Sequence, residues 1–213
     1  MQSNFSIMGM IQEGYYATYP LLFISVICLA IIFERAWALW GVGPKTAKLA
    51  DSLVPQLREG KFNEALQATQ ARSTAAQRIF HTLIAGSQTM DRDHLLELDD
   101  ERRYQEGLEF KRYIWVLATA GASAPFIGLF GTVVGILVAF QSMAIMGTGG
   151  FSVVAAGISA ALISTALGLG VAIVAVIFFN YFSVKTQNIN ALLQINGDRL
   201  IDAALQGRQA GGR

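Results

Sequence analysis

Two threonines carry the most suggestive chemistry in this sequence. Thr132 and Thr165 each lie in a long uncharged stretch, among residues with little side-chain bulk. A threonine hydroxyl can accept and donate a hydrogen bond, which suits a short relay of water molecules or protons. A buried threonine also commonly donates its hydroxyl to a carbonyl one turn back in its own helix, which is a structural role alone. The residues leave both interpretations open.

Small residues surround the two threonines at helical spacing. Such residues let membrane helices approach closely, so helix packing alone is a sufficient explanation of these faces. Lining of a pore is the alternative. On the helix that contains Thr132, the opposite side carries the bulky Leu129, Val133, Ile136 and Phe140. The expected packing or pore-facing residues are Pro125, Gly128, Gly131, Gly135, Ala160, Ala161 and Gly168.

The stretch that contains both threonines belongs in a membrane. From Tyr113 to Val184 the chain has no Asp, Glu, Lys, Arg or His. One crossing of a bilayer needs about 20 apolar residues, so this stretch holds at least two crossings. Its one strong turn signal is the glycine-rich run at residues 147–150. The pattern therefore predicts a helical hairpin.

The positions of the charges predict the topology. All 16 Lys and Arg lie between Arg35 and Arg112 or after Val184, while the first 34 residues have none. The positive-inside rule then places the N-terminus outside and both basic segments in the cytoplasm. The predicted order is a periplasmic amphipathic segment (1–18), a first membrane helix (19–40), a cytoplasmic helical domain (41–112), a second membrane helix (113–146), a periplasmic turn (147–150), a third membrane helix (151–184) and a cytoplasmic C-terminal helix and tail (185–213).

Composition supports an all-α membrane protein. The chain is 53% hydrophobic and 15% charged, which is too apolar for a soluble domain of this length. The cytoplasmic segment has equal numbers of acidic and basic residues, so nucleic-acid binding has no electrostatic basis. Cys28 is the lone cysteine, and His81 and His94 have poor metal-ligand spacing, so no metal or cofactor site is expected. No motif indicates an enzyme.

The cytoplasmic segment predicts a helical domain. Residues 51–58, 63–69 and 74–87 have apolar residues at helical spacing, with a turn at Gly60. Asp91 is expected to cap a helix that continues without interruption into the second membrane helix. The charged run at residues 99–103 is expected to be a solvated helix face. Residues 185–206 predict an amphipathic helix, and residues 207–213 a frayed end.

The segments APFIGLFGTVVGI (residues 124–136) and GISAALISTALGL (residues 157–169) resemble the MotA/TolQ/ExbB proton-channel family, in its ExbB/TolQ branch. Asn180, the Glu34–Arg35 pair and the predicted topology also match, so the resemblance covers essentially the whole chain. The resemblance implies a fivefold ring of subunits in the bacterial inner membrane around a dimer of an ExbD/TolR-like protein. That partner would supply a membrane aspartate beside Thr132 and Thr165, and the complex would convert proton flow into periplasmic work.

This chain departs from the ExbB/TolQ pattern at two positions. Ala160 stands where these members usually have a glutamate, and Val174 where they usually have a proline. The departures bring a gliding motor into consideration beside TonB-linked and Tol-Pal-linked systems. They also leave a nonconducting membrane scaffold as an alternative. The sequence contains no group of residues that would support a third alternative, a small-molecule transporter or an enzyme.

Overall fold

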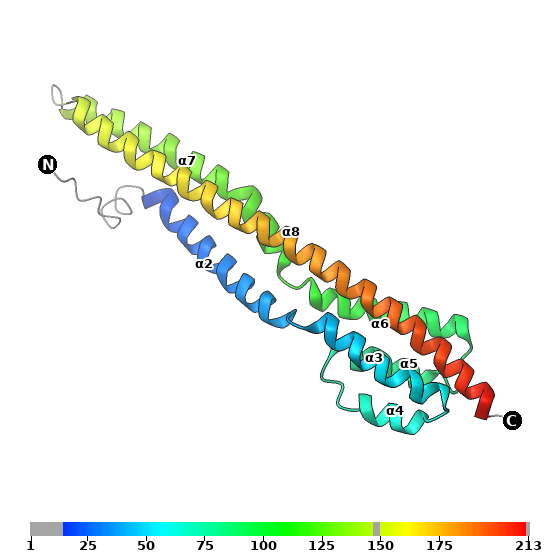
Figure 1. The fold of residues 1–213 in the computed structure, drawn as a ribbon. Helices are drawn as coiled ribbons and strands as arrows, with labels where there is room; N and C mark the ends of the chain where they lie inside the picture. Colours follow the sequence, from blue (N-terminus) through cyan, green and yellow to red (C-terminus); the bar gives the residue numbers. More distant parts are fainter. Residues whose placement is uncertain (1–14, 147–149, 212–213) are drawn as a thin grey trace. The chain divides into compact units, whose positions relative to one another are not determined.

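The computed structural model describes residues 15–146 and 150–211. Across these residues all regular structure is α-helix, which confirms the all-α prediction for this part of the chain (Figure 1). The helices are α2 (Tyr15–Ala38), α3 (Val42–Arg58), α4 (Phe62–Thr69), α5 (Ala75–Gly86), α6 (Arg92–Phe110), α7 (Ile114–Met146) and α8 (Gly150–Gly211).

The helices form two compact units. The apolar unit comprises Met1–Ala36 and Tyr113–Phe182, and the polar unit comprises Trp37–Arg112 and Ser183–Arg213. Three helical stretches are long and apolar enough to cross a membrane, beginning at Ala17, Ile114 and Val154. The expectation of three membrane-spanning helices is therefore confirmed by length and composition. Long α8 contributes residues to both units.

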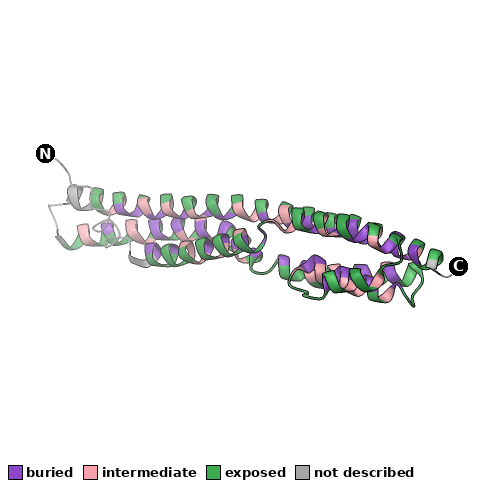
Figure 2. Cartoon of the chain, turned by 60° about the horizontal axis from the view of Figure 1, so that its bottom comes forward, coloured by how far each residue is buried: buried purple, intermediate pink, exposed green. Residues whose placement is uncertain are grey.

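The apolar unit consists mainly of α7 and α8, which run side by side in opposite directions (Figure 1). Buried positions recur along both helices between exposed ones (Figure 2). Large apolar side chains such as Val133 and Phe140 are more than half exposed, as expected for residues that face lipid. Helix α2 begins at Tyr15, earlier than the predicted 19, and ends at Ala38. The predicted amphipathic segment at 1–18 falls mostly outside the described residues, as does the predicted turn except Gly150.

In the polar unit, the short helices begin and end at the local signals of the sequence. Gly60 adopts a φ of 74°, which only glycine adopts without strain, and it separates α3 from α4. Thr74 caps α5 with a reciprocal capping box that involves Gln77. Asp91 accepts a hydrogen bond from the backbone N–H of His94, so its predicted capping role is confirmed. The core of this unit includes the fully buried Leu53, Leu57, Ile79, Phe80 and Leu83.

The predicted continuous helix from Asp91 into the membrane is wrong. Helix α6 ends at Phe110, and Tyr113 has a φ of 63° before α7 begins at Ile114. The N–H of Arg112 bonds to the carbonyl of Glu109 at 3.2 Å, which tightens the last turn of α6. No local pattern predicts this break, because the junction contains neither glycine nor proline. The break coincides with the change from charged to uncharged residues.

The prediction of a frayed C-terminal end is also wrong up to Gly211. Residues 185–211 continue α8 rather than forming a separate helix. Gly207 is buried, and a Cβ atom on it would lie only 1.8 Å from the carbonyl oxygen of Leu57. The end of α8 therefore packs backbone to backbone on α3. Residues 212–213 lie outside the described part.

Candidate functional site

Thr165 joins the two long helices of the apolar unit. Its hydroxyl donates a hydrogen bond to the carbonyl oxygen of Gly128 on α7, at 3.1 Å. Gly128 permits this approach, because a Cβ atom there would lie 2.9 Å from the carbonyl oxygen of Ser164 and 3.0 Å from the Cα of Thr165. The Thr165 side chain is only partly buried. Its hydroxyl thus bonds across a helix interface instead of to a carbonyl in its own helix.

Thr132 has a different hydrogen-bond arrangement. It is 8% exposed, and its hydroxyl donates to the carbonyl of Leu129 in the same helix, at 2.7 Å. This is the bond expected of a structural threonine. Thr132 nevertheless follows Gly128 by one helical turn, so it shares a face of α7 with the carbonyl that accepts from Thr165. The structure therefore brings the two predicted residues to one stretch of α7, with their hydroxyl hydrogens directed to different carbonyls.

A further pair of hydroxyls lies in the same unit. The Oγ1 of Thr18 on α2 is 3.4 Å from the Oγ of Ser164 on α8, and both residues are buried. Sequence reasoning missed Thr18, because it assigned residues 1–18 to a segment outside the membrane. The available signal was the helical spacing of Thr18, Leu21, Cys28 and Ile32, all of which are buried on α2.

The predicted small residues pack within one chain. A Cβ atom on Gly131 would lie 2.4 Å from the Cβ of Ala17 on α2. A Cβ on Gly135 would lie 2.8 Å from the Cβ of Ala161 on α8. A Cβ on Gly168 would lie 2.6 Å from the carbonyl oxygen of Ala124, at the apolar cluster with Leu21 and Ala172. Ala160 is buried, whereas Pro125 is only partly buried.

The surroundings of the threonines carry no charge along α7 or the membrane part of α8. Residues 113–184 contain no Asp, Glu, Lys, Arg or His. In the apolar unit the described charges belong to Glu34 and Arg35 near the end of α2, and the Arg35 guanidinium donates to the Glu34 carboxylate. A hydroxyl can pass a proton between two titratable groups, but it cannot store one at neutral pH. The site can act as a proton relay only if another group beside it binds and releases the proton.

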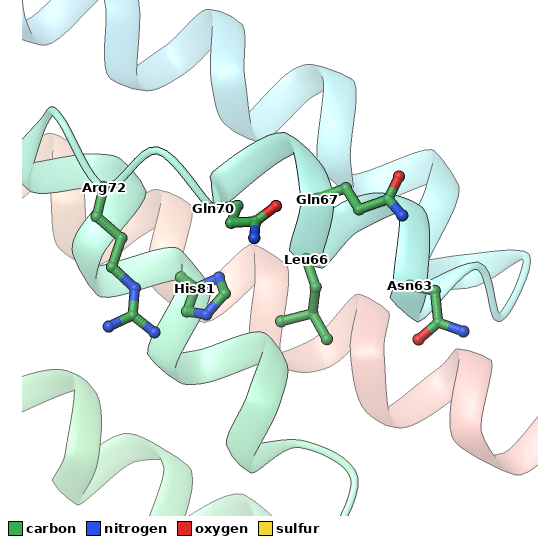
Figure 3. Close-up of a pocket in the computed structure, with 6 residues that line it drawn as sticks. All are labelled: Asn63, Leu66, Gln67, Gln70, Arg72 and His81. Atoms are coloured by element: carbon green, nitrogen blue, oxygen red, sulfur yellow. The ribbon is translucent and has the colours of Figure 1, made fainter.

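The two histidines lie in different surroundings, one exposed and one partly buried. His94 is exposed, and its Nδ1 lies 2.6 Å from a carboxylate oxygen of Asp91, which raises the pKa of His94. His81 is partly buried, with its Nδ1 3.0 Å from the Oγ1 of Thr69. The His81 ring also lines an open cavity of about 720 Å³ beside Gln70 and Arg72 (Figure 3). Within residues 15–146 and 150–211, no three His, Cys, Asp or Glu side chains gather as metal ligands.

Comparison with known proteins connects this arrangement to a family. Residues 74–195 match the MotA/TolQ/ExbB proton channel family. The biopolymer transport protein ExbB of Salmonella typhimurium is 31% identical over 206 residues, which cover 91% of this chain and 84% of that protein. ExbB of Pseudomonas putida is 33% identical over 173 residues, but the match spans 75% of this chain and about half, 53%, of that protein. The Tol-Pal system protein TolQ of Pseudomonas aeruginosa is 42% identical over 88 residues, or 41% of this chain and 36% of that protein.

The length of the ExbB match and the three apolar helices both indicate a membrane protein of this family. The family match includes more than half of the chain, with Thr132, Thr165 and their small neighbours inside it. The three apolar helices, together with these relatives, identify a multi-pass membrane protein. The family transports ions and is not a family of enzymes. The chain belongs to the MotA/TolQ/ExbB proton channel family, in its ExbB/TolQ-like branch.

Proposed function

We propose that this chain is the proton-channel, or stator, subunit of a motor in the bacterial inner membrane. In this proposal several copies, five by family resemblance, surround a dimer of an ExbD/TolR-like protein with one membrane helix. The N-terminus faces the periplasm and the polar unit faces the cytoplasm, in accord with the distribution of Lys and Arg. The observation that carries the proposal is a pair of hydroxyls, on Thr132 and Thr165, at an uncharged glycine-lined interface in a proton-channel family member.

The partner is needed because this chain has no Asp, Glu, Lys, Arg or His along α7 and the apolar part of α8. A proton that crosses a membrane potential of 100 mV releases about 2.3 kcal/mol, but a conducting site must first bind and release that proton. An aspartate on the partner's membrane helix would provide this step. Ala160 strengthens the argument, since it stands where related chains usually have a glutamate. The partner's carboxylate is then the sole acid of the proposed path at this depth.

Thr165 is the better placed of the two relay candidates. Its partly buried hydroxyl already donates across the interface, and its oxygen can accept a second hydrogen bond from water or from a carboxylic acid. Passing a proton requires the hydroxyl to leave the Gly128 carbonyl and donate elsewhere. The net cost of exchanging one neutral hydrogen bond is about 1 kcal/mol, so the exchange is compatible with conduction. Thr132, with its bond inside α7, would hold the next position along the same face.

The driven process would be work in the periplasm or at the outer membrane. The matched relatives carry the names of a biopolymer transport protein and a Tol-Pal system protein. We propose a role of that kind for this chain, or one in gliding motility. The three processes would differ in what the partner contacts outside the membrane.

The test is proton uptake into liposomes under an imposed potential. The protein is reconstituted alone and with a candidate partner that has one N-terminal membrane helix carrying an aspartate. The proposal predicts uptake only with both proteins, and loss of uptake when the partner's aspartate is replaced by asparagine. A verified, intact complex that passes no protons would contradict the proposal and favour a nonconducting scaffold.

A further inference from the structure

A second cavity lies within the polar unit, at the points where this part of the chain adjoins the membrane helices in sequence. It has a volume of about 390 Å³. Its walls come from the α2–α3 junction, the start of α5 and the end of α6. The lining residues that matter here are Trp37, Trp40, Lys45, Thr74, Arg78 and Phe110.

The cavity is amphipathic. One part of the lining is aromatic, with Trp37 at 86% and Trp40 at 78% exposure, and with Phe110 at the end of α6. The other lining residues are small or aliphatic, such as Val42 and Ala75, or polar and cationic, such as Lys45 and Thr74, and among the described lining residues there is no Asp or Glu. A ligand that fits this cavity therefore combines an apolar portion with a negatively charged group.

The two cations of the cavity have different roles. The Nε of Arg78 donates to a carboxylate oxygen of Glu106 at 2.6 Å, so Arg78 is held as part of the wall. Lys45 is exposed and makes no ion pair within the described part of the chain. The Oγ1 of Thr74 accepts from the N–H of Gln77 at 3.3 Å, and its own hydroxyl hydrogen can point to a ligand. An anion would thus be bound mainly by Lys45, with Thr74 as a neutral donor.

In sequence, the aromatic residues of the cavity directly adjoin the membrane helices. Trp37 directly follows Ala36, the last residue of α2 in the apolar unit. Phe110 ends α6, and α7 begins shortly after it at Ile114. Tryptophan is enriched at the interface between lipid and water, where its ring is amphipathic. The anionic lipids of the cytoplasmic leaflet attract basic side chains that adjoin a membrane helix, by about 1 kcal/mol for each Lys or Arg. Exposed tryptophans next to an unpaired lysine meet both conditions.

We propose that this cavity binds an anionic phospholipid. Its phosphate would contact Lys45 and the Thr74 hydroxyl, while its acyl chains would leave along Trp37 and Trp40 toward the bilayer. This site is separate from Thr132 and Thr165. The proposal concerns lipid recognition, and its outcome does not depend on whether the protein conducts protons.

Native mass spectrometry of the purified full-length protein tests the proposal. The protein is titrated with phosphatidylglycerol and, separately, with phosphatidylcholine of the same acyl chains, and bound lipid is counted. We expect a preference for phosphatidylglycerol that falls about fivefold in Lys45→Gln, as expected for the loss of one cation near a membrane surface. Lys48→Gln is the matched control, because Lys48 is an exposed lysine on the same helix and does not line the cavity.

Four outcomes would overturn the proposal. Equal binding of the two lipids by the wild-type protein would show that the cavity does not select an anionic lipid. An unchanged preference in Lys45→Gln, or an equal loss in Lys48→Gln, would place any selectivity elsewhere. A lipid-specific site also requires that soluble glycerol phosphate, at the same concentration, fail to displace bound phosphatidylglycerol, whereas equal displacement would identify a site for free phosphate. Circular dichroism confirms that each variant is folded.

Discussion

Asp99 is the residue whose environment differs most from the sequence prediction. It belongs to the charged run at 99–103, which predicts a solvated face, yet Asp99 is fully buried. One carboxylate oxygen accepts from the Nε of Arg103 at 2.6 Å, and the other has no hydrogen-bond partner in the described part of the chain. Asp99 follows the buried Leu95 by one helical turn, so both point inward from α6. The packed neighbour is Gly197, where a Cβ atom would lie 2.7 Å from Asp99 Oδ1.

Burial raises the pKa of Asp99 from 3.8 to about 6, against the opposing effect of the Arg103 guanidinium, while Asp198 and Asp100 add to the rise. Between these values the folded state holds a proton that the unfolded state releases, so this group's contribution to stability falls as pH rises through 6. We predict that acidification from pH 7.5 to 5.5 raises the melting temperature of the wild-type protein by about 2–3 °C more than that of Asp99→Asn.

The control for this prediction is Asp100→Asn. Asp100 also contacts Arg103, but its side chain is largely exposed. The melting temperatures of this variant and of the wild type should shift together with pH. If Asp99→Asn retains the full pH dependence of the wild-type protein, Asp99 is not the group that titrates.

At the proposed proton path, the sequence predicted the residues but not their bonds. Thr132 and Thr165 stand out as hydroxyls on small-residue faces in an uncharged stretch. Which carbonyl each hydroxyl reaches depends on the register of α7 against α8, which no local pattern specifies. Thr18 was missed because residues 1–18 were assigned to a segment outside the membrane, although α2 begins at Tyr15 and Thr18 contacts Ser164.

Among the elements, the contact between α7 and α8 depends on glycines at defined positions. A Cβ atom on Gly168 would lie 2.6 Å from the carbonyl oxygen of Ala124, a backbone atom that cannot move aside alone. For Gly170, on the same helix, no atom lies within 4 Å of the added Cβ. We predict that Gly168→Ala destabilises the protein by about 1–3 kcal/mol through overpacking, whereas Gly170→Ala has little effect. Thermal melting in detergent measures the difference.

Equal stability of Gly168→Ala and Gly170→Ala would contradict the packing of α7 against α8. A loss that is as large in Gly170→Ala would instead indicate a general intolerance of alanine in this part of α8. The comparison separates the two explanations because both positions lie inside one helix and differ in what a methyl group would contact.

The elements also show what sequence patterns omit. Caps and turns at Gly60, Thr74 and Asp91 follow from local chemistry, so the short helices of the polar unit were predictable. The break before α7 was not, since Tyr113 adopts its φ of 63° without a glycine or asparagine to signal it. A left-handed conformation at a bulky residue costs about 1–2 kcal/mol, and the surrounding packing must compensate for it.

For the whole molecule, the distribution of charge was the most informative feature. It predicted three apolar helices and a separate helical domain, and long motifs identified the family. The continuation of α8 to Gly211 was missed because the end of the chain looked polar and glycine-rich, whereas Gly207 is required for contact with α3. The ring and the partner's acid cannot follow from the physics of one chain, because they depend on surfaces of other molecules.

The central claim is that a proton passes the Thr165 hydroxyl in a complex with the acid-bearing partner. The most direct measurement compares proton uptake by liposomes that contain the partner with wild-type protein, Thr165→Val or Thr165→Ser. Valine preserves the volume without the hydroxyl, and serine retains the hydroxyl. The account predicts that Thr165→Val lowers uptake by about tenfold or more, equivalent to about 1.4 kcal/mol of barrier, and that Thr165→Ser retains most of it. Wild-type uptake by an intact Thr165→Val complex would contradict the account.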